Sequence, residues 1–120
     1  MSRRVWTLEE ANAALGRVAA IVEQAQAALV ASRAAVTRVR SNGHKNPADP
    51  EGLLRQAVEE LAADGIVLRD AERGLVDFPA RSPSGRDYWL CWLVGEPEVA
   101  WWHWPEAGFA GRRPVEELPD

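Results

Sequence analysis

One sixteen-residue stretch decides how this chain folds: residues 89–104, which read WLCWLVGEPEVAWWHW. The stretch contains five of the six tryptophans, the only cysteine, Cys91, and one of the two histidines, His103. Tryptophan is bulky, and its indole N–H needs a hydrogen-bond partner when the ring is buried. The apolar runs on either side of Gly95-Glu96-Pro97-Glu98 predict two neighbouring strands, Asp87 to Val94 and Val99 to Trp104.

Two more strands are expected before this stretch. Residues Gly65–Asp70 and Leu75–Pro79 are short apolar runs, and segments rich in turn-forming residues follow them at 71–74 and 81–85. Connections this short join antiparallel neighbours, because parallel strands need a long crossover. We therefore expect a four-stranded antiparallel β-meander over residues 65–104, followed by an irregular C-terminal tail over residues 105–120.

Alternation along these strands predicts a sheet that is apolar on both faces. If the loops close symmetrically, one face carries Val76, Phe78, Tyr88, Leu90, Trp92, Val99, Trp101 and His103. The other face then carries Leu75, Asp77, Trp89, Cys91, Leu93, Trp102 and Trp104. One face is expected to meet the helices, and the other to meet the tail, a partner chain or a ligand. A slip of one residue would exchange the faces of a strand.

The N-terminal third predicts a long helix over residues 8–41. Thr7 and Glu10 have the spacing of a capping box, which marks a helix start. Apolar residues then recur every seven positions from Leu8 onward, and a second, alanine-rich register begins at Ala11. This pattern is held over about five heptads, which is typical of a coiled coil or a long bundle helix.

A loop over residues 42–50 and a second helix over residues 51–64 are expected next. Asp49 or Asn46 is expected to cap the second helix, with a proline at its first position. At the standard rise the two helices would be about 51 Å and about 21 Å long, so the second cannot cover the whole apolar seam of the first. We therefore predict a coiled-coil-like helical hairpin that self-associates as a dimer, within one α+β domain spanning residues 1–120.

Composition favours a soluble cytoplasmic protein. The single cysteine cannot form an internal disulfide, as expected in a reducing compartment. No uninterrupted apolar run reaches the roughly 20 residues that span a bilayer, so no membrane partner is expected. The net charge of −4 argues against nucleic acid as a partner, although four basic residues and no acid lie between Arg33 and Lys45. A basic helix tip that contacts an anionic partner is therefore kept as a third hypothesis.

Several motifs along the chain are more distinctive than its composition. The front carries WTLEEAN at residues 6–12, and the second half carries GLVDFP at 74–79, LCW at 90–92 and GEPE at 95–98. At these motifs the chain resembles a bacterial family called domain of unknown function 2203. It differs at Arg69, where the resemblance implies a lysine. The family has no established activity, so the resemblance implies no catalytic residues.

Asp77 is the first candidate site residue, because an aspartate inside an apolar strand is unusual. A buried carboxylate has to be paired, hydrogen-bonded or protonated. Arg112, Arg113 and Arg86 are the expected partners. The favoured interpretation is a structural salt bridge that docks the tail. The alternative is a general base or a ligand-binding carboxylate.

His103 is the second candidate, at the end of a tryptophan-rich strand. It could join Asp77, Cys91, Glu96 or Glu98 in a metal site, but no pair has a recognised ligand spacing such as Cys-x-x-Cys. We therefore predict no metal and no cofactor. Cys91 is expected to be a small buried hydrophobe on the face opposite His103, which disfavours a Cys–His nucleophilic pair.

The tail motif GFAGRRP at residues 108–114 places two arginines in a glycine-hinged loop. The favoured interpretation is that Arg112 and Arg113 clamp acidic side chains; the alternative is that they bind an anion. The sequence thus favours a small interaction or structural module over an enzyme. The competing hypothesis is a small enzyme or a ligand- or metal-binding protein, whose site lies near Asp77, Glu96, Glu98, His103 and Arg112.

Overall fold

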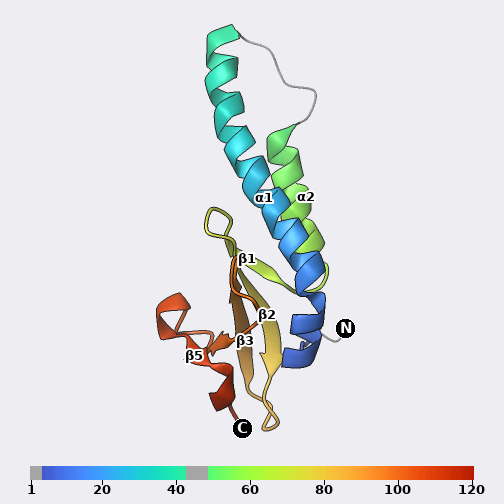
Figure 1. The fold of residues 1–120 in the computed structure, drawn as a ribbon, viewed down its shortest axis with the longest axis vertical. Helices are drawn as coiled ribbons and strands as arrows, with labels where there is room; N and C mark the ends of the chain where they lie inside the picture. Colours follow the sequence, from blue (N-terminus) through green and yellow to red (C-terminus); the bar gives the residue numbers. More distant parts are fainter. Residues whose placement is uncertain (1–3, 43–48) are drawn as a thin grey trace.

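The computed structural model describes residues 4–42 and 49–120, and the side chains of residues 4–34 and 49–120 (Figure 1). Its elements in chain order are α1 (Leu8–Asn42), α2 (Pro50–Ala62), β1 (Val67–Asp70), β2 (Leu75–Arg81), β3 (Asp87–Leu93), β4 (Trp101–His103), the 3-10 helix η1 (Phe109–Gly111), β5 (Arg113–Pro114) and the 3-10 helix η2 (Val115–Glu117).

The α+β class is confirmed, and the sheet has one strand more than predicted. The described strands form one antiparallel sheet in the order β1-β2-β3-β4-β5. The extra strand, β5, lies in the segment that was expected to be an irregular tail. It pairs with β4, where Trp101 is opposite Pro114 and Trp102 is opposite Arg113. The tail is therefore held at the edge of the sheet by backbone pairing.

The start of α1 is a capping box. The Thr7 N–H donates to Glu10 Oε1 at 2.9 Å, and the Glu10 N–H donates to Thr7 Oγ1 at 3.1 Å. These two bonds satisfy amides that the first helical turn leaves without an intrahelical partner. The second helix begins at Pro50 with Asp49 as its N-cap residue, although the Asp49 side chain makes no capping hydrogen bond. Asn46, the other predicted cap, lies outside the described residues.

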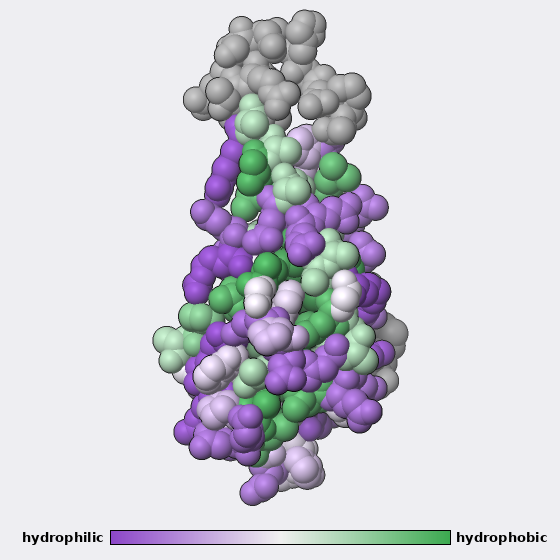
Figure 2. Space-filling view, viewed as in Figure 1, coloured by the Kyte–Doolittle hydropathy of each residue, from purple (hydrophilic) through white to green (hydrophobic). Residues whose placement is uncertain are grey.

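The two helices form a hairpin of unequal arms. α1 has 35 residues and α2 has 13. In Figure 1, α2 lies beside the middle of α1, and the first turns of α1 lie beside the sheet. Apolar side chains remain exposed on this hairpin, with Val30 66% exposed, Val58 40% and Leu53 38% (Figure 2). The side chains of the last predicted heptad, and those of Arg38, Arg40 and Lys45 at the predicted basic helix tip, lie outside the described residues.

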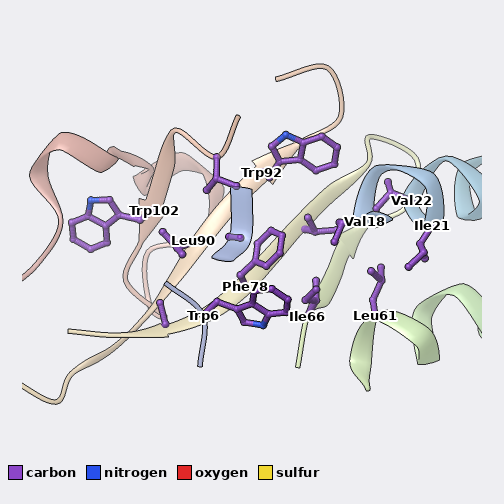
Figure 3. Packing of buried hydrophobic residues seen from close by; sticks show 14 of the residues in the cluster. Trp6, Val18, Ile21, Val22, Leu61, Ile66, Phe78, Leu90, Trp92 and Trp102 are labelled. Carbon is purple, nitrogen blue, oxygen red and sulfur yellow. The ribbon is translucent and has the colours of Figure 1, made fainter. Parts of the chain in front are cut away.

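The hydrophobic core lies between α1, α2 and one face of the sheet (Figure 3). From the sheet it receives alternate residues of β2 and β3, including Val76, Phe78 and Leu90. Trp6 packs edge-on against Phe78, with ring centroids 5.3 Å apart, and its indole N–H donates to the Asp64 carbonyl at 3.0 Å. The face that packs on the helices is called the core face here, and the opposite one the outer face.

The predicted sorting of side chains is wrong for β4. Trp102 pairs with Leu90 and so lies on the core face, whereas Trp101 pairs with Cys91 on the outer face. The cause is the start of the strand. Val99 was predicted to begin it, but its N–H donates to the Asn12 side chain of α1 at 2.7 Å, and strand pairing begins only at Trp101. His103 consequently shares the outer face with Cys91, the reverse of the prediction.

One stretch of α1, Leu8–Ala34, is long and apolar enough to cross a membrane by length and composition alone. This is weak evidence, because a core helix of a soluble protein meets the same criteria. Four residues of this stretch, Ala11, Val18, Val22 and Ala25, are fully buried against the rest of the chain. The helix therefore packs on the core through part of its apolar surface, since 28% of this apolar window is buried.

Gly74 provides the first test of this fold. It closes the β1–β2 turn at φ +74°, and an added Cβ would lie 2.9 Å from the Cβ of Val94. Gly74→Ala should lower the free energy of unfolding by about 1–2 kcal/mol for the left-handed backbone and by about 2 kcal/mol more for the overlap. Gly85→Ala is the matched control, because Gly85 also has positive φ but has open space around it. Equal losses for the two variants in urea denaturation would contradict the packing at Gly74.

Candidate functional site

A pocket of about 240 Å³ opens on the outer face of the sheet. Its lining residues come from strands β1 to β4 and from the tail after β4. In Figure 1 this tail lies on the side of the sheet away from α1. The lining residues are Arg69, Leu75, Asp77, Cys91, His103, Pro105, Gly108 and Phe109. Three of them, Asp77, Cys91 and His103, are polar or nucleophilic and almost fully buried.

Asp77 lies in β2 with only 1% of its surface exposed. Its Oδ2 accepts hydrogen bonds from Arg69 Nε and from His103 Nε2, each at 2.9 Å. Its Oδ1 is buried and has no hydrogen-bond partner among the described residues. Burial raises the pKa of Asp77, but the hydrogen bonds from His103 and Arg69 outweigh it, so the pKa is lowered and the carboxylate is ionised.

The partner of Asp77 is Arg69, and the predicted pairing with Arg112, Arg113 or Arg86 is wrong. Arg69 is the extra residue of a β-bulge, because Leu68 pairs with Val76 while Asp70 pairs with the adjacent Leu75. A bulge re-aims the side chain that it inserts. Here it directs the guanidinium onto Asp77 and over the Trp89 ring, with Arg69 Cζ 4.8 Å from the ring centroid.

Both ring nitrogens of His103 face acceptors. Nδ1 lies 2.8 Å from the Trp104 carbonyl, and Nε2 lies 2.9 Å from Asp77 Oδ2. A carbonyl and an ionised carboxylate only accept, so the imidazole donates at both nitrogens and is protonated. Burial lowers the pKa of His103, but the bonds to Asp77 and Trp104 outweigh it and the pKa is raised. Asp77, His103 and Arg69 therefore form a buried charge cluster.

Cys91 lies in β3, fully buried, beside Asp77 and His103. Burial, and after it the negative charge of Asp77, raise the pKa of the Cys91 thiol to about 12. A thiol with this pKa is not a nucleophile near neutral pH, because the thiolate is the reactive form. His103 does not activate it either, since both imidazole nitrogens are used elsewhere. The arrangement does not support nucleophilic catalysis by Cys91.

The same three side chains do have the arrangement of metal ligands. One ligand atom each from Asp77, Cys91 and His103 lies within 4.8 Å of the other two. Sequence spacing did not predict this cluster, because each ligand comes from a different strand. The signal that could have found it was the strand register: Asp77 pairs with Cys91, and Cys91 is two residues from Trp89, which pairs with His103.

The remaining predicted residues lie around the pocket or away from it. Arg112 forms a two-pronged ion pair with Glu96, with Nη2 2.8 Å and 2.9 Å from the two carboxylate oxygens. This pair docks the tail onto the β3–β4 loop. Glu98 is exposed. Arg113 is exposed and lies over Trp102, which faces the core, so it does not reach the pocket.

The charge cluster of Asp77, His103 and Arg69 should stabilise the metal-free protein within a limited range of pH, with stability lost on both the acidic and the alkaline side. The raised pKa of His103 gives stabilisation that is full below its ordinary value of 6.5 and is lost as pH rises through the folded-state pKa. The lowered pKa of Asp77 gives stabilisation that is present above 3.8 and is lost as pH falls through its folded-state pKa.

His103→Gln should therefore remove the loss of stability on the alkaline side and cost roughly 1–3 kcal/mol near neutral pH. Urea denaturation from about pH 5 to about pH 9 measures both effects. Glu98→Gln, at an exposed carboxylate, is the control and should keep the pH profile of the parent. An alkaline branch that persists in His103→Gln would show that another group is responsible.

The chain was compared with family models, curated proteins and solved structures. The model of the family described as "Uncharacterized conserved protein (DUF2203)" matches residues 4–115, which includes every residue of the pocket. No curated protein and no solved structure matches the chain. The family carries no assigned activity, so the pocket has to be interpreted from its own chemistry. By the match over nearly its whole length, the chain belongs to the DUF2203 family of uncharacterized conserved proteins.

Proposed function

We propose that this protein is a small metal-binding protein, which holds a divalent transition-metal ion between Asp77, Cys91 and His103. The observation that carries the proposal is the convergence of a carboxylate, a thiol and an imidazole within 4.8 Å of one another at the floor of a pocket. Thiolate and imidazole ligands favour zinc and related metals over magnesium or calcium. The prediction that the chain carries no metal is therefore replaced.

The distances are compatible with tetrahedral coordination after small side-chain movements. Zinc ligands lie about 2.0–2.3 Å from the ion, which puts neighbouring ligand atoms about 3.5 Å apart. The Nε2–Oδ2 hydrogen bond of 2.9 Å is the part of the cluster that an ion would open, by taking the place of the shared proton. Binding would also deprotonate the Cys91 thiol, as a coordinated metal does.

Two features around the cluster support ligation. His103 Nδ1 is oriented by the Trp104 carbonyl, which leaves Nε2 directed at the cluster, as in metal-bound histidines. Asp77 Oδ1 is buried without a partner, and an unpaired buried oxygen carries a desolvation cost that a cation would remove. A purely structural salt bridge would explain Oδ2, whereas the other side chain that acts on this carboxylate is the Cys91 thiol, which is only a weak donor.

Three protein ligands leave one tetrahedral position open. Structural zinc sites have four protein ligands, whereas catalytic sites keep a position for water or substrate. Here the open position would face the pocket between Leu75 and Phe109. The site thus has the form used by metal-dependent enzymes that activate a bound water, and an open metal centre is the function that it supports best.

The test is metal loading of the purified protein. One equivalent of Zn²⁺ per chain is expected by elemental analysis, and Co²⁺ loading should give a thiolate-to-cobalt charge-transfer band. Cys91→Ser should lose that band, and His103→Gln should bind Co²⁺ at least about tenfold more weakly, while Glu98→Gln should match the parent. The elemental analysis uses the parent protein, so its result does not depend on whether a variant folds. Failure of the folded parent to take up either metal would overturn the proposal.

We also propose that the helical hairpin joins two copies of this chain in the cytoplasm. Val30, Leu53 and Val58 support this second role, since they are large apolar residues exposed on α1 and α2. A buried free cysteine is compatible with a reducing compartment.

Light scattering at micromolar concentration should then give twice the chain mass of 13.2 kDa. Val30→Glu should shift the protein towards monomer, whereas Ala13→Glu, at an exposed position in the first half of α1, should not. A parent protein that is monomeric across this range would contradict self-association and would leave the metal proposal untouched.

A further inference from the structure

We propose that the pocket binds a small oxyanion, a carboxylate or a phosphate group, with one oxygen on the metal and another on the guanidinium of Arg69. The inference rests on the proposed metal site, because the open coordination position supplies one of the two contacts. It adds the chemical class of the ligand, which neither the family nor the ligand set specifies.

The guanidinium of Arg69 is already oriented for contact with such a ligand. Its Nε is used by Asp77, and the plane of its guanidinium is steadied over Trp89. Within residues 4–34 and 49–120, its two Nη groups make no hydrogen bond. Arg69 lines the pocket, and 41% of its side chain is exposed. A guanidinium held in one orientation can donate to the oxygen of a carboxylate or phosphate that the metal does not hold. Because its orientation is set beforehand, binding costs little side-chain entropy.

Charge in the pocket favours the same ligand. A divalent ion with one carboxylate, one thiolate and one neutral imidazole is uncharged overall, so Arg69 leaves the floor with one positive charge. Arg73 adds a second near the rim, where its Cζ lies 4.5 Å from the ring centroid of Phe109. Arg112 contributes little, since Glu96 neutralises it. A monoanion would neutralise the positive charge of Arg69 at the pocket floor, where burial strengthens charge interactions.

The dimensions limit the rest of the ligand. The pocket of about 240 Å³ is smaller than the roughly 300–1,000 Å³ of sites for drug-sized molecules. Leu75, Pro105 and Phe109 form apolar walls beyond the charged floor. The fitting ligand is therefore a small metabolite, or the end of a longer molecule, that carries one acidic group and a short apolar part.

The experiment titrates the Co²⁺-loaded protein with sodium acetate, sodium phosphate and neutral acetamide, and follows the visible cobalt bands. Acetate or phosphate should shift the bands and acetamide should not. The tighter of the two anions identifies the carboxylate or the phosphate as the natural group. Arg69→Gln should weaken anion binding at least about tenfold, the effect of one charge-assisted hydrogen bond.

Two further variants separate charge from shape. Arg69→Lys keeps the charge without the fork and should fall between the parent and Arg69→Gln. Arg113→Gln is the matched control, because Arg113 lies over Trp102 on the core-face side and should bind anions within about twofold of the parent. Charge-transfer intensity in each titration reports whether cobalt stays bound, so a loss of metal is not mistaken for a loss of anion affinity.

The outcomes distinguish the two proposals. Cobalt that loads but ignores both anions would overturn the oxyanion inference and leave the metal site standing. Equal binding of acetamide and acetate, or unchanged anion affinity in Arg69→Gln, would also overturn it. A parent protein without the charge-transfer band would overturn the metal proposal and this inference together.

Discussion

The buried carboxylate of Asp77 is the constraint on which the outer half of this structure depends. An ionised group with 1% exposure in the middle of a sheet is tolerated only with charged or hydrogen-bonding partners. Two other strands meet that requirement: β1 through a bulge that presents Arg69, and β4, which lies beyond β3, through a register that presents His103. Removing one partner of such a buried pair is far costlier than the pair is stabilising. The bulge and the register of β4 are therefore coupled to a single side chain.

Successive residues of a strand face two different environments, the hydrophobic core on one side of the sheet and the outer face with its pocket on the other. Along β3, Leu90 and Trp92 enter the core while Cys91 between them enters the pocket. The tryptophans divide likewise, with Trp102 in the core and Trp89 under the Arg69 guanidinium on the outer face. The helices cover one face by apolar packing. The tail covers part of the other through β5 and the Arg112–Glu96 pair, so the outer face keeps a pocket.

Local signals predicted most of this fold. The Thr7–Glu10 capping box and the proline at the first position of α2 mark the helix starts, and short turns mark an antiparallel meander, because these features depend on residues close in sequence. The register of β4 could not be predicted from such local signals. Just before this strand the Val99 amide donates to the Asn12 side chain, which is 87 positions away in the sequence. That one-residue difference hid the approach of His103 to Cys91. Arg69 was missed for a related reason, since a bulge breaks the alternation on which the prediction relied.

The position of the pocket also decides how the two proposed roles relate. The exposed apolar residues of the hairpin lie on α1 and α2, whereas the pocket lies on the face of the sheet turned away from α1 (Figure 1). Association through the hairpin would therefore leave the pocket open to solvent in each copy. The ligand set is complete within one chain, since Asp77, Cys91 and His103 belong to a single sheet. The proposed metal binding would thus require no second copy, and the proposed self-association would be a separate property of the helices.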